Sequence, residues 1–159
     1  MMNGAVPRIG HLASGALDAI SDVAGVTVGH STLSAGGVQT GVTVVRAHGG
    51  DPFADRVPAG FFVINGFGKS TGLMQVAELG LLETPIALTS TFAVPAVAEA
   101  QIRACIASHP ECGRSLPTVN PLVFECNDGF LNDAQRFAIG EIEYRDAIAS
   151  ASSAFGQGA

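Results

Sequence analysis

The residues best suited to chemistry in this sequence are gathered in a short polar stretch, positions 125–133. This stretch places three acids and two amides within nine residues and follows the apolar run 122–124. Polar loops after strands are common places for ligand contacts, and a negative, partly sheltered strand end suits a cationic amine. The same residues also fit a solvated turn in which Asn and Asp side chains only cap the strand. Composition leaves both interpretations open.

A glycine-rich stretch, positions 65–72, offers two further motifs. Gly-Lys-Ser at 68–70 suggests a phosphate-binding loop, but that motif requires glycine where Val63 stands. The stretch also matches the Gly-x-Ser-x-Gly pattern around Ser70, although a nucleophile elbow lies directly at a strand end. Residues 66–68 intervene here, and the only later histidine is His109. A strand-to-helix turn is the preferred interpretation, with a serine esterase using Ser70 as an alternative.

Neither a metal nor a cofactor is expected. Cys105 and Cys112 are too widely spaced for a zinc knuckle, and His109 between them lacks a partner. The stretch beginning at Glu125 resembles a calcium loop only superficially. Such a loop needs glycine at its sixth position, whereas Gly129 is the fifth residue counted from Glu125.

Apolar patterning predicts strands and helices that would position these residues within one domain spanning 1–159. Runs rich in Val and Thr, or short and wholly apolar, predict strands at 26–29, 39–46, 61–64, 85–88 and 122–125. Helical spacing predicts helices at 70–82, 93–107 and 141–154. Residues 1–20 are expected to form a loose arm.

Composition excludes several classes of function. The chain has a formal net charge of −6 and a single lysine, so it lacks the basic face that nucleic-acid binding requires. No apolar segment reaches the length of about 18 residues that a membrane helix needs, and no signal peptide is visible. The three cysteines are an odd number for a disulfide framework and predict reduced thiols in the cytoplasm.

An ordered series of motifs resembles one enzyme family, the DmpA-type D-aminopeptidases and β-peptidyl aminopeptidases. The resemblance covers about residues 16–146 and ends most strongly in the polar stretch. The matching segments are residues 19–30 (AISDVAGVTVGH), 40–43 (TGVT), 65–68 (NGFG), 82–91 (LETPIALTST), 120–121 (NP) and 125–133 (ECNDGFLND).

The resemblance implies an α+β fold, a four-layer αββα sandwich with two sheets between helical layers. It also implies a precursor that cleaves itself, freeing an N-terminal serine that attacks amides. Substrates would be short peptides, amino-acid amides or esters with a free amino end, and the enzyme would be a homo-oligomer. The residues that match the family's substrate pocket are Glu125, Asn127, Asp128 and Phe130.

Two departures from the family limit what carries over. In the family, the helix matching residues 141–154 is followed by an oxyanion-hole Asn, the cleavage site and the nucleophile, none of which is present here. Phe130 also stands where the family can carry a tyrosine. We therefore expect this chain to contain no catalytic residue and to require a C-terminal polypeptide of the same precursor. A non-catalytic structural subunit or truncated remnant is the rival hypothesis.

Overall fold

The computed structural model describes residues 10–159 of the chain. The arm expected over residues 1–20 therefore lies partly outside the described residues. Its described part contains only bends, and it leads into a 3-10 helix at Ile20–Asp22.

A four-stranded sheet forms the centre of the molecule, in the order β1-β2-β5-β6. Strands β1 (Thr27–Ala35) and β2 (Val38–Arg46) form an antiparallel hairpin, and β5 (Ile86–Ser90) pairs antiparallel to β2. The hairpin turns at Gly36 and Gly37, whose φ angles of 57° and 85° favour glycine. Strand β6 (Leu122–Cys126) pairs parallel to β5. This pairing requires a crossover connection between the two strands.

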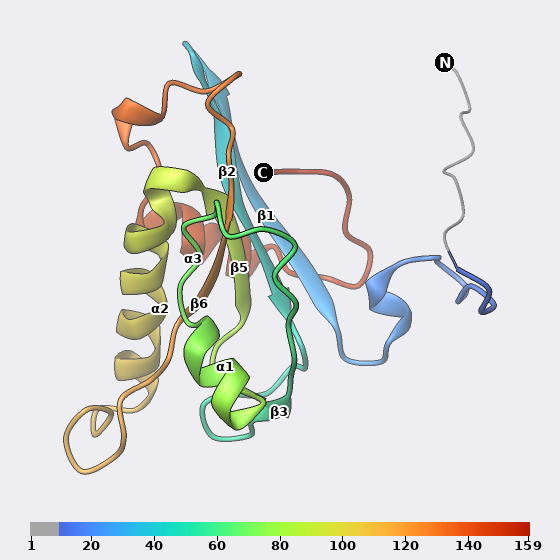
Figure 1. Ribbon diagram of the computed structural model, residues 1–159, viewed down its shortest axis with the longest axis vertical. Coiled ribbons are helices and arrows are strands. Elements are labelled where there is room, and N and C mark those ends of the chain that lie inside the picture. Colours follow the sequence, from blue (N-terminus) through green and yellow to red (C-terminus); the bar gives the residue numbers. More distant parts are fainter. Residues whose placement is uncertain (1–9) are drawn as a thin grey trace.

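Two helices cover one face of this sheet. Helix α2 (Val94–Ser108) is the crossover from β5 to β6, and α3 (Glu141–Ala149) packs on β1 and β2. Figure 1 shows α3 behind the sheet and the short helix α1 (Leu73–Leu79) in front of it. The main core lies between the sheet and the helices α2 and α3. It includes the fully buried residues Val42, Val44, Ala87, Val97, Val123 and Ala147.

The opposite face of the sheet carries smaller elements. Helix α1 lies beside the two-stranded pair of β3 (Val57–Pro58) and β4 (Leu81–Leu82), over a cluster that includes Val76, Leu82 and Leu122. The C-terminal segment crosses near β1, where Ser152 pairs with Val28. The backbone amide of Ala159 then donates a 2.7 Å hydrogen bond to the Thr32 hydroxyl.

Gln101 is a buried polar side chain of α2, only 2% exposed. Its Oε1 accepts a 2.9 Å hydrogen bond from the Leu122 amide, and its Nε2 donates a 2.8 Å bond to the Pro85 carbonyl. This α2 residue therefore ties together the beginnings of β5 and β6.

The predicted α+β class is confirmed, and so are most of the predicted elements. Of the four layers implied by the resemblance, the described residues supply one helical layer and one large sheet. Within residues 10–159 we find no helix whose length and apolar character would let it cross a membrane.

One predicted strand is absent, and two predicted helices are shorter than expected. Residues 61–64 form no strand, and Phe62 and Ile64 are 88% and 91% exposed. The place beside the free edge of β6 is taken instead by Thr71, which pairs with Val123. The helix predicted over 70–82 is confined to Leu73–Leu79 because Gly72 and Gly80, with φ of 89° and 63°, interrupt it at both ends. The helix predicted over 141–154 ends at Ala149.

Candidate functional site

Glu125 lies at the carboxyl end of β6, next to the end of β5. Because β5 and β6 are parallel, both strands end at the same edge of the sheet, and Glu125 pairs in register with Thr89. The chain continues from β5 into a 3-10 turn that begins at Thr91, whose hydroxyl donates a 2.6 Å hydrogen bond to Glu125 Oε1. The other carboxylate oxygen, Oε2, accepts a 3.1 Å bond from the Lys69 amide. The carboxylate is therefore held in place at both oxygens.

The glycine-rich segment serves to position this carboxylate. The Glu125 amide donates a 3.2 Å bond to Ser70 Oγ, so segment 68–70 is attached to Glu125 through both main chain and side chain. A Cβ at Gly68 would lie 2.9 Å from Glu125 Oε2, closer than real Cβ atoms approach. The Lys69 ammonium points elsewhere and donates a 2.8 Å bond to the Phe67 carbonyl. The segment is a turn that binds a carboxylate and leads into α1. Among the described residues no strand directly precedes it, so only the second half of the predicted strand-to-helix turn is present.

Among residues 10–159, the Glu125 carboxylate has neutral hydrogen-bond donors but no cationic partner. None of the ion pairs formed within residues 10–159 includes Glu125. A carboxylate has about four lone-pair sites, of which the Thr91 hydroxyl and the Lys69 amide occupy two. The side chain is half-buried, so its remaining sites can accept further donors. This arrangement suits a charge-assisted hydrogen bond from an ammonium group.

Asn127 and Asp128 shape the turn that follows. Asn127 Oδ1 accepts a 3.0 Å hydrogen bond from the Gly129 amide, which closes an Asx turn. The Asp128 carbonyl accepts bonds from the amides of Leu131 and Asn132, and Asp128 Oδ2 accepts one from the Asn132 side chain. For these two residues the structure therefore supports the turn interpretation, which does not preclude a further contact with a ligand.

The four predicted site residues do not converge on one cavity. Side chains alternate across a strand, so Glu125 and Cys126 point to opposite faces of the sheet. A hollow of about 230 Å³ on the Cys126 side is lined by Asp128 but by none of the other three. Phe130 is 98% exposed. The remaining lining residues of the hollow are Gln39, Thr40, Gly41, Thr43, Leu88, Thr89, Ser90, Cys126 and Ala159.

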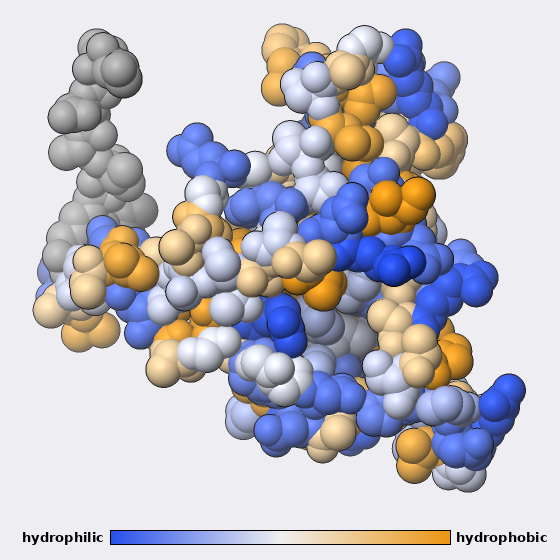
Figure 2. Space-filling model, turned by 180° about the vertical axis from the view of Figure 1, so that it is seen from behind, coloured by the Kyte–Doolittle hydropathy of each residue, from blue (hydrophilic) through white to orange (hydrophobic). Residues whose placement is uncertain are grey.

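Figure 2 shows hydrophobic atoms at the upper end of the molecule, where Figure 1 places the β1–β2 turn and the loop around residues 127–137. Phe130, Leu131 and Phe137 are exposed in this loop, and the ring of Phe137 stacks on that of Phe92 at 5.9 Å. This apolar loop borders the end of β6 that carries Glu125.

Sequence reasoning missed Thr91 and the Lys69 amide as partners of Glu125. Thr91 stands just after the predicted strand 85–88, and its place after a parallel strand was the available signal. The alternative based on Ser70 gains no support, because Ser70 Oγ accepts the Glu125 amide while His109 pairs with Asp51. A larger cavity, of about 780 Å³, lies at the other end of β5 and β6 and includes Pro85 and Gln101 in its wall.

Comparisons with known proteins show which solved structures this fold is similar to. A structure of an L-aminopeptidase and D-Ala-esterase/amidase from Ochrobactrum anthropi, described as a prototype of the serine aminopeptidases and a variant of the Ntn hydrolase fold, matches with a TM-score of 0.81 and 28% identity over 95% of this chain and 44% of that one. The PH0078 protein of Pyrococcus horikoshii matches with a TM-score of 0.89 and 38% identity over 93% and 44%. The described residues are thus similar in fold to a little under half of each of these two proteins.

The family itself is identified by sequence. The model of peptidase family S58 matches residues 18–159, so the chain belongs to that family. The β-peptidyl aminopeptidase BapA of Sphingosinicella xenopeptidilytica is 40% identical over 128 residues, which are 75% of this chain and 31% of BapA. The chain therefore spans about a third of that relative, and the family resemblance inferred from the motifs is confirmed.

Proposed function

We propose that this chain forms the amine-binding part of a serine aminopeptidase that hydrolyses short peptides, amino-acid amides or esters with a free amino terminus. The observation that carries the proposal is the Glu125 carboxylate, fixed by Thr91 and the Lys69 amide and without a cationic partner among the described residues. Membership of peptidase family S58 supports the reaction class.

In this proposal, one polypeptide binds the substrate amine and a second polypeptide carries the catalytic groups. Glu125 accepts hydrogen bonds from the substrate ammonium and orients the scissile amide. The exposed ring of Phe130 borders the bound substrate from the loop that follows β6, and Asn127 and Asp128 shape the turn between them. The nucleophilic serine and the oxyanion donor come from a second polypeptide, which a precursor releases by cleaving itself. The relatives are more than twice as long as the part that matches this chain, which leaves room for such a polypeptide.

The proposal also includes assembly with further copies of the enzyme in the cytoplasm. Large apolar side chains on the surface support such an assembly, among them Phe62, Ile64, Phe67 and Met74. The free cysteines are compatible with a reducing compartment.

The test is to express the full reading frame that contains this chain. We expect the product to appear as two polypeptides after purification and to release amine from amino-acid anilides. An intact single polypeptide without hydrolytic activity would refute the aminopeptidase and would favour the non-catalytic subunit. Retention of activity after removal of every N-terminal serine candidate would refute the proposed nucleophile.

A further inference from the structure

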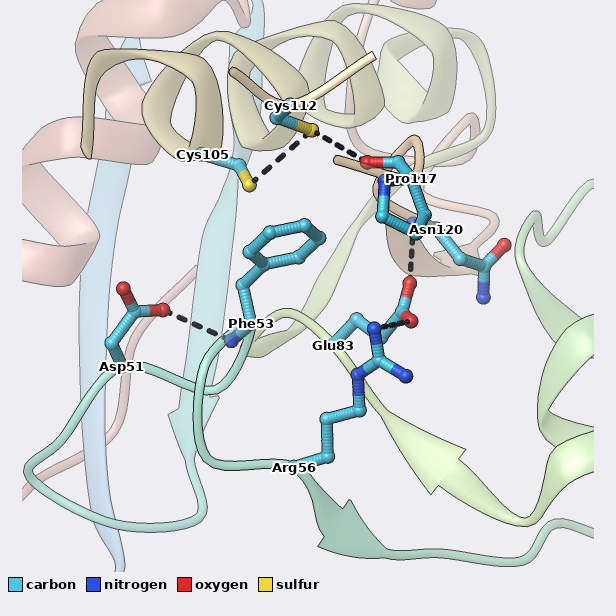
Figure 3. A network of polar contacts seen from close by, with 8 residues as sticks. All are labelled: Asp51, Phe53, Arg56, Glu83, Cys105, Cys112, Pro117 and Asn120. Atoms are coloured by element: carbon cyan, nitrogen blue, oxygen red, sulfur yellow. Dashed lines mark hydrogen bonds and ion pairs between the residues drawn. The ribbon is translucent and has the colours of Figure 1, made fainter. Parts of the chain in front are cut away.

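A pair of thiols lies far from Glu125, beside the cavity of about 780 Å³. Cys105 comes from the last turns of α2 and Cys112 from the loop that follows, and their Sγ atoms are 3.9 Å apart. Figure 3 shows the two sulfurs directed toward one another above the ring of Phe53. Cys112 is buried, whereas Cys105 is half-buried and lines the cavity. One sulfur of the pair is therefore reached from solvent and the other is sheltered behind it.

The surroundings hold this pair together at both ends of the loop. Phe53 and Val119 pack against Cys112 in a small cluster that also touches Cys105. The amide of Asn120 donates a 2.9 Å bond to the buried Glu83 carboxylate, which pairs with Arg56 at 3.0 Å. Figure 3 shows these contacts as one network below the thiols. The loop 109–121 is thus anchored independently of the cysteines, so the sulfurs remain neighbours without a covalent bond.

We propose that Cys105 and Cys112 form a reversible dithiol–disulfide site, whose reactant is a low-molecular-weight disulfide of the glutathione class. The sulfurs must approach by about 2 Å to reach bonding distance. The two cysteines are only seven positions apart in the sequence. Rotation of the Cys105 side chain and a small movement of the turn around Gly113 are therefore enough to bring the sulfurs together.

The reaction is a pair of thiol–disulfide exchanges. The Cys105 thiolate attacks one sulfur of the reagent, the reagent's S–S bond breaks, and the leaving thiolate takes up a proton in place of the one that Cys105 lost. The Cys112 thiolate then attacks Cys105 Sγ and displaces the second reagent thiol in the same way. Two protein thiols are oxidised to one disulfide, and one reagent disulfide is reduced to two thiols.

The order of attack follows from the geometry. Cys105 faces the cavity and meets the reagent first, whereas Cys112 is placed to resolve the mixed disulfide. Burial, followed by the hydrogen bond to Cys112, raises the pKa of the Cys105 thiol to about 12. The first exchange is therefore slow at neutral pH. The product fixes the end of α2 to the loop 109–121, which leads directly into β6.

The experiment uses the Cys126→Ser variant, which removes the exposed third thiol. The purified folded protein is equilibrated with oxidised glutathione, alkylated and mapped by mass spectrometry. We expect loss of both remaining thiols, a mass lower by about 2 Da, and a peptide pair linked through Cys105 and Cys112. Reduced glutathione should restore both thiols. The matched control, Cys112→Ser with Cys126→Ser, should stop at a single mixed disulfide on Cys105.

Three outcomes would overturn the proposal. These are the persistence of both thiols at equilibrium, a mixed disulfide on Cys105 as the final product while Cys112 is present, and a cross-link that forms only after denaturation. Wild-type protein mapped in the same way provides a second measurement that needs no variant to fold. In wild type, a disulfide that joins Cys126 to either partner, in place of the Cys105–Cys112 link, would also refute the assignment.

Discussion

Glu125 Oε2 lies 3.1 Å from the amide nitrogen of Lys69, a residue 56 positions earlier in the chain. This contact joins the glycine-rich segment to the end of β6. The backbone of the segment, which resembles a phosphate-binding loop in sequence, thus binds a carboxylate of the protein itself. It also explains why Gly68 lacks space for a side chain, since a Cβ there would crowd the same oxygen. One carboxylate thus serves the local structure and remains available to a ligand.

Replacing Glu125 by Gln should weaken the enzyme selectively. Gln keeps the shape and removes the charge, and hydrogen bonds to charged groups contribute about 1.5–3 kcal/mol. In the complete enzyme, kcat/KM for substrates with a free amine should fall roughly ten- to a hundredfold. N-acetylated substrates should be processed poorly by both forms. Glu78→Gln on the exposed surface of α1 is the matched control. Equal discrimination by Glu125→Gln and wild type would contradict the amine-binding role.

Truncation of Phe130 should separate function from stability. Its ring is 98% exposed, so Phe130→Ala should change the free energy of unfolding by less than about 0.5 kcal/mol. The same substitution at buried Phe53, in contrast, should lower the free energy of unfolding by about 3 kcal/mol. If Phe130 borders the bound substrate, kcat/KM of the complete enzyme should nevertheless fall. Unchanged kinetics in Phe130→Ala would remove this residue from the site.

Gly72 should tolerate no side chain. Its φ is 89°, and a Cβ would collide with the Pro121 carbonyl. The left-handed conformation alone costs about 1–3 kcal/mol for a non-glycine residue, so Gly72→Ala should lower the melting temperature clearly. Gly49 has open space around it, and Gly49→Ala is the control that should melt like wild type. Chemical denaturation of the two variants side by side would decide the matter.

The pair of Asp51 and His109 should make the stability of the fold depend on pH in the acid range. Burial opposes ionisation of Asp51, but hydrogen bonds from His109 and from the Phe53 amide outweigh it and lower the pKa of the carboxyl. A lowered folded pKa stabilises the protein fully above the unfolded value of about 3.9, and the benefit is lost as the pH falls through the folded pKa. The difference in melting temperature between wild type and Asp51→Asn should therefore shrink below about pH 4.

A polypeptide of residues 1–159 alone should not hydrolyse amino-acid anilides. The proposal assigns the nucleophile and the oxyanion donor to another polypeptide, and each contributes orders of magnitude to the rate. Turnover by this polypeptide that persists through a second purification step would show that the nucleophile lies within it. Addition of the second polypeptide should restore activity if the two parts can associate.

Much of this fold is predictable because its strands and helices follow their sequence periods. Strands β2, β5 and β6 and helix α2 all lie close to their expected positions, whereas β1 begins where expected but continues to Ala35. The run 61–64 is apolar but exposed, because Thr71 rather than this run pairs with β6. Short apolar runs carry no period that distinguishes such cases.

Glu125 was predictable as a strand-end acid, but its partners were not. Thr91 and Lys69 are distant in sequence, and only the parallel pairing of β5 and β6 and the path of segment 68–71 bring them to the same edge. Local composition also could not show that Asp128 and Glu125 lie on opposite sides of the sheet. Asp128 lines the hollow, whereas Glu125 faces the other side. That separation depends on strand register.

The buried side chain of Gln101 bears directly on that register. Leu122, Val123 and Phe124 are consecutive apolar residues, so β6 is apolar on both faces at its beginning. A slip by one residue would turn each side chain to the other face but would exchange one apolar side chain for another. Gln101 forms hydrogen bonds with the Leu122 amide and the Pro85 carbonyl. A shift of β6 would therefore leave buried polar groups without partners. One buried amide group at the beginning of β6 therefore helps to determine on which face of the sheet the Glu125 carboxylate, at the end of that strand, is presented.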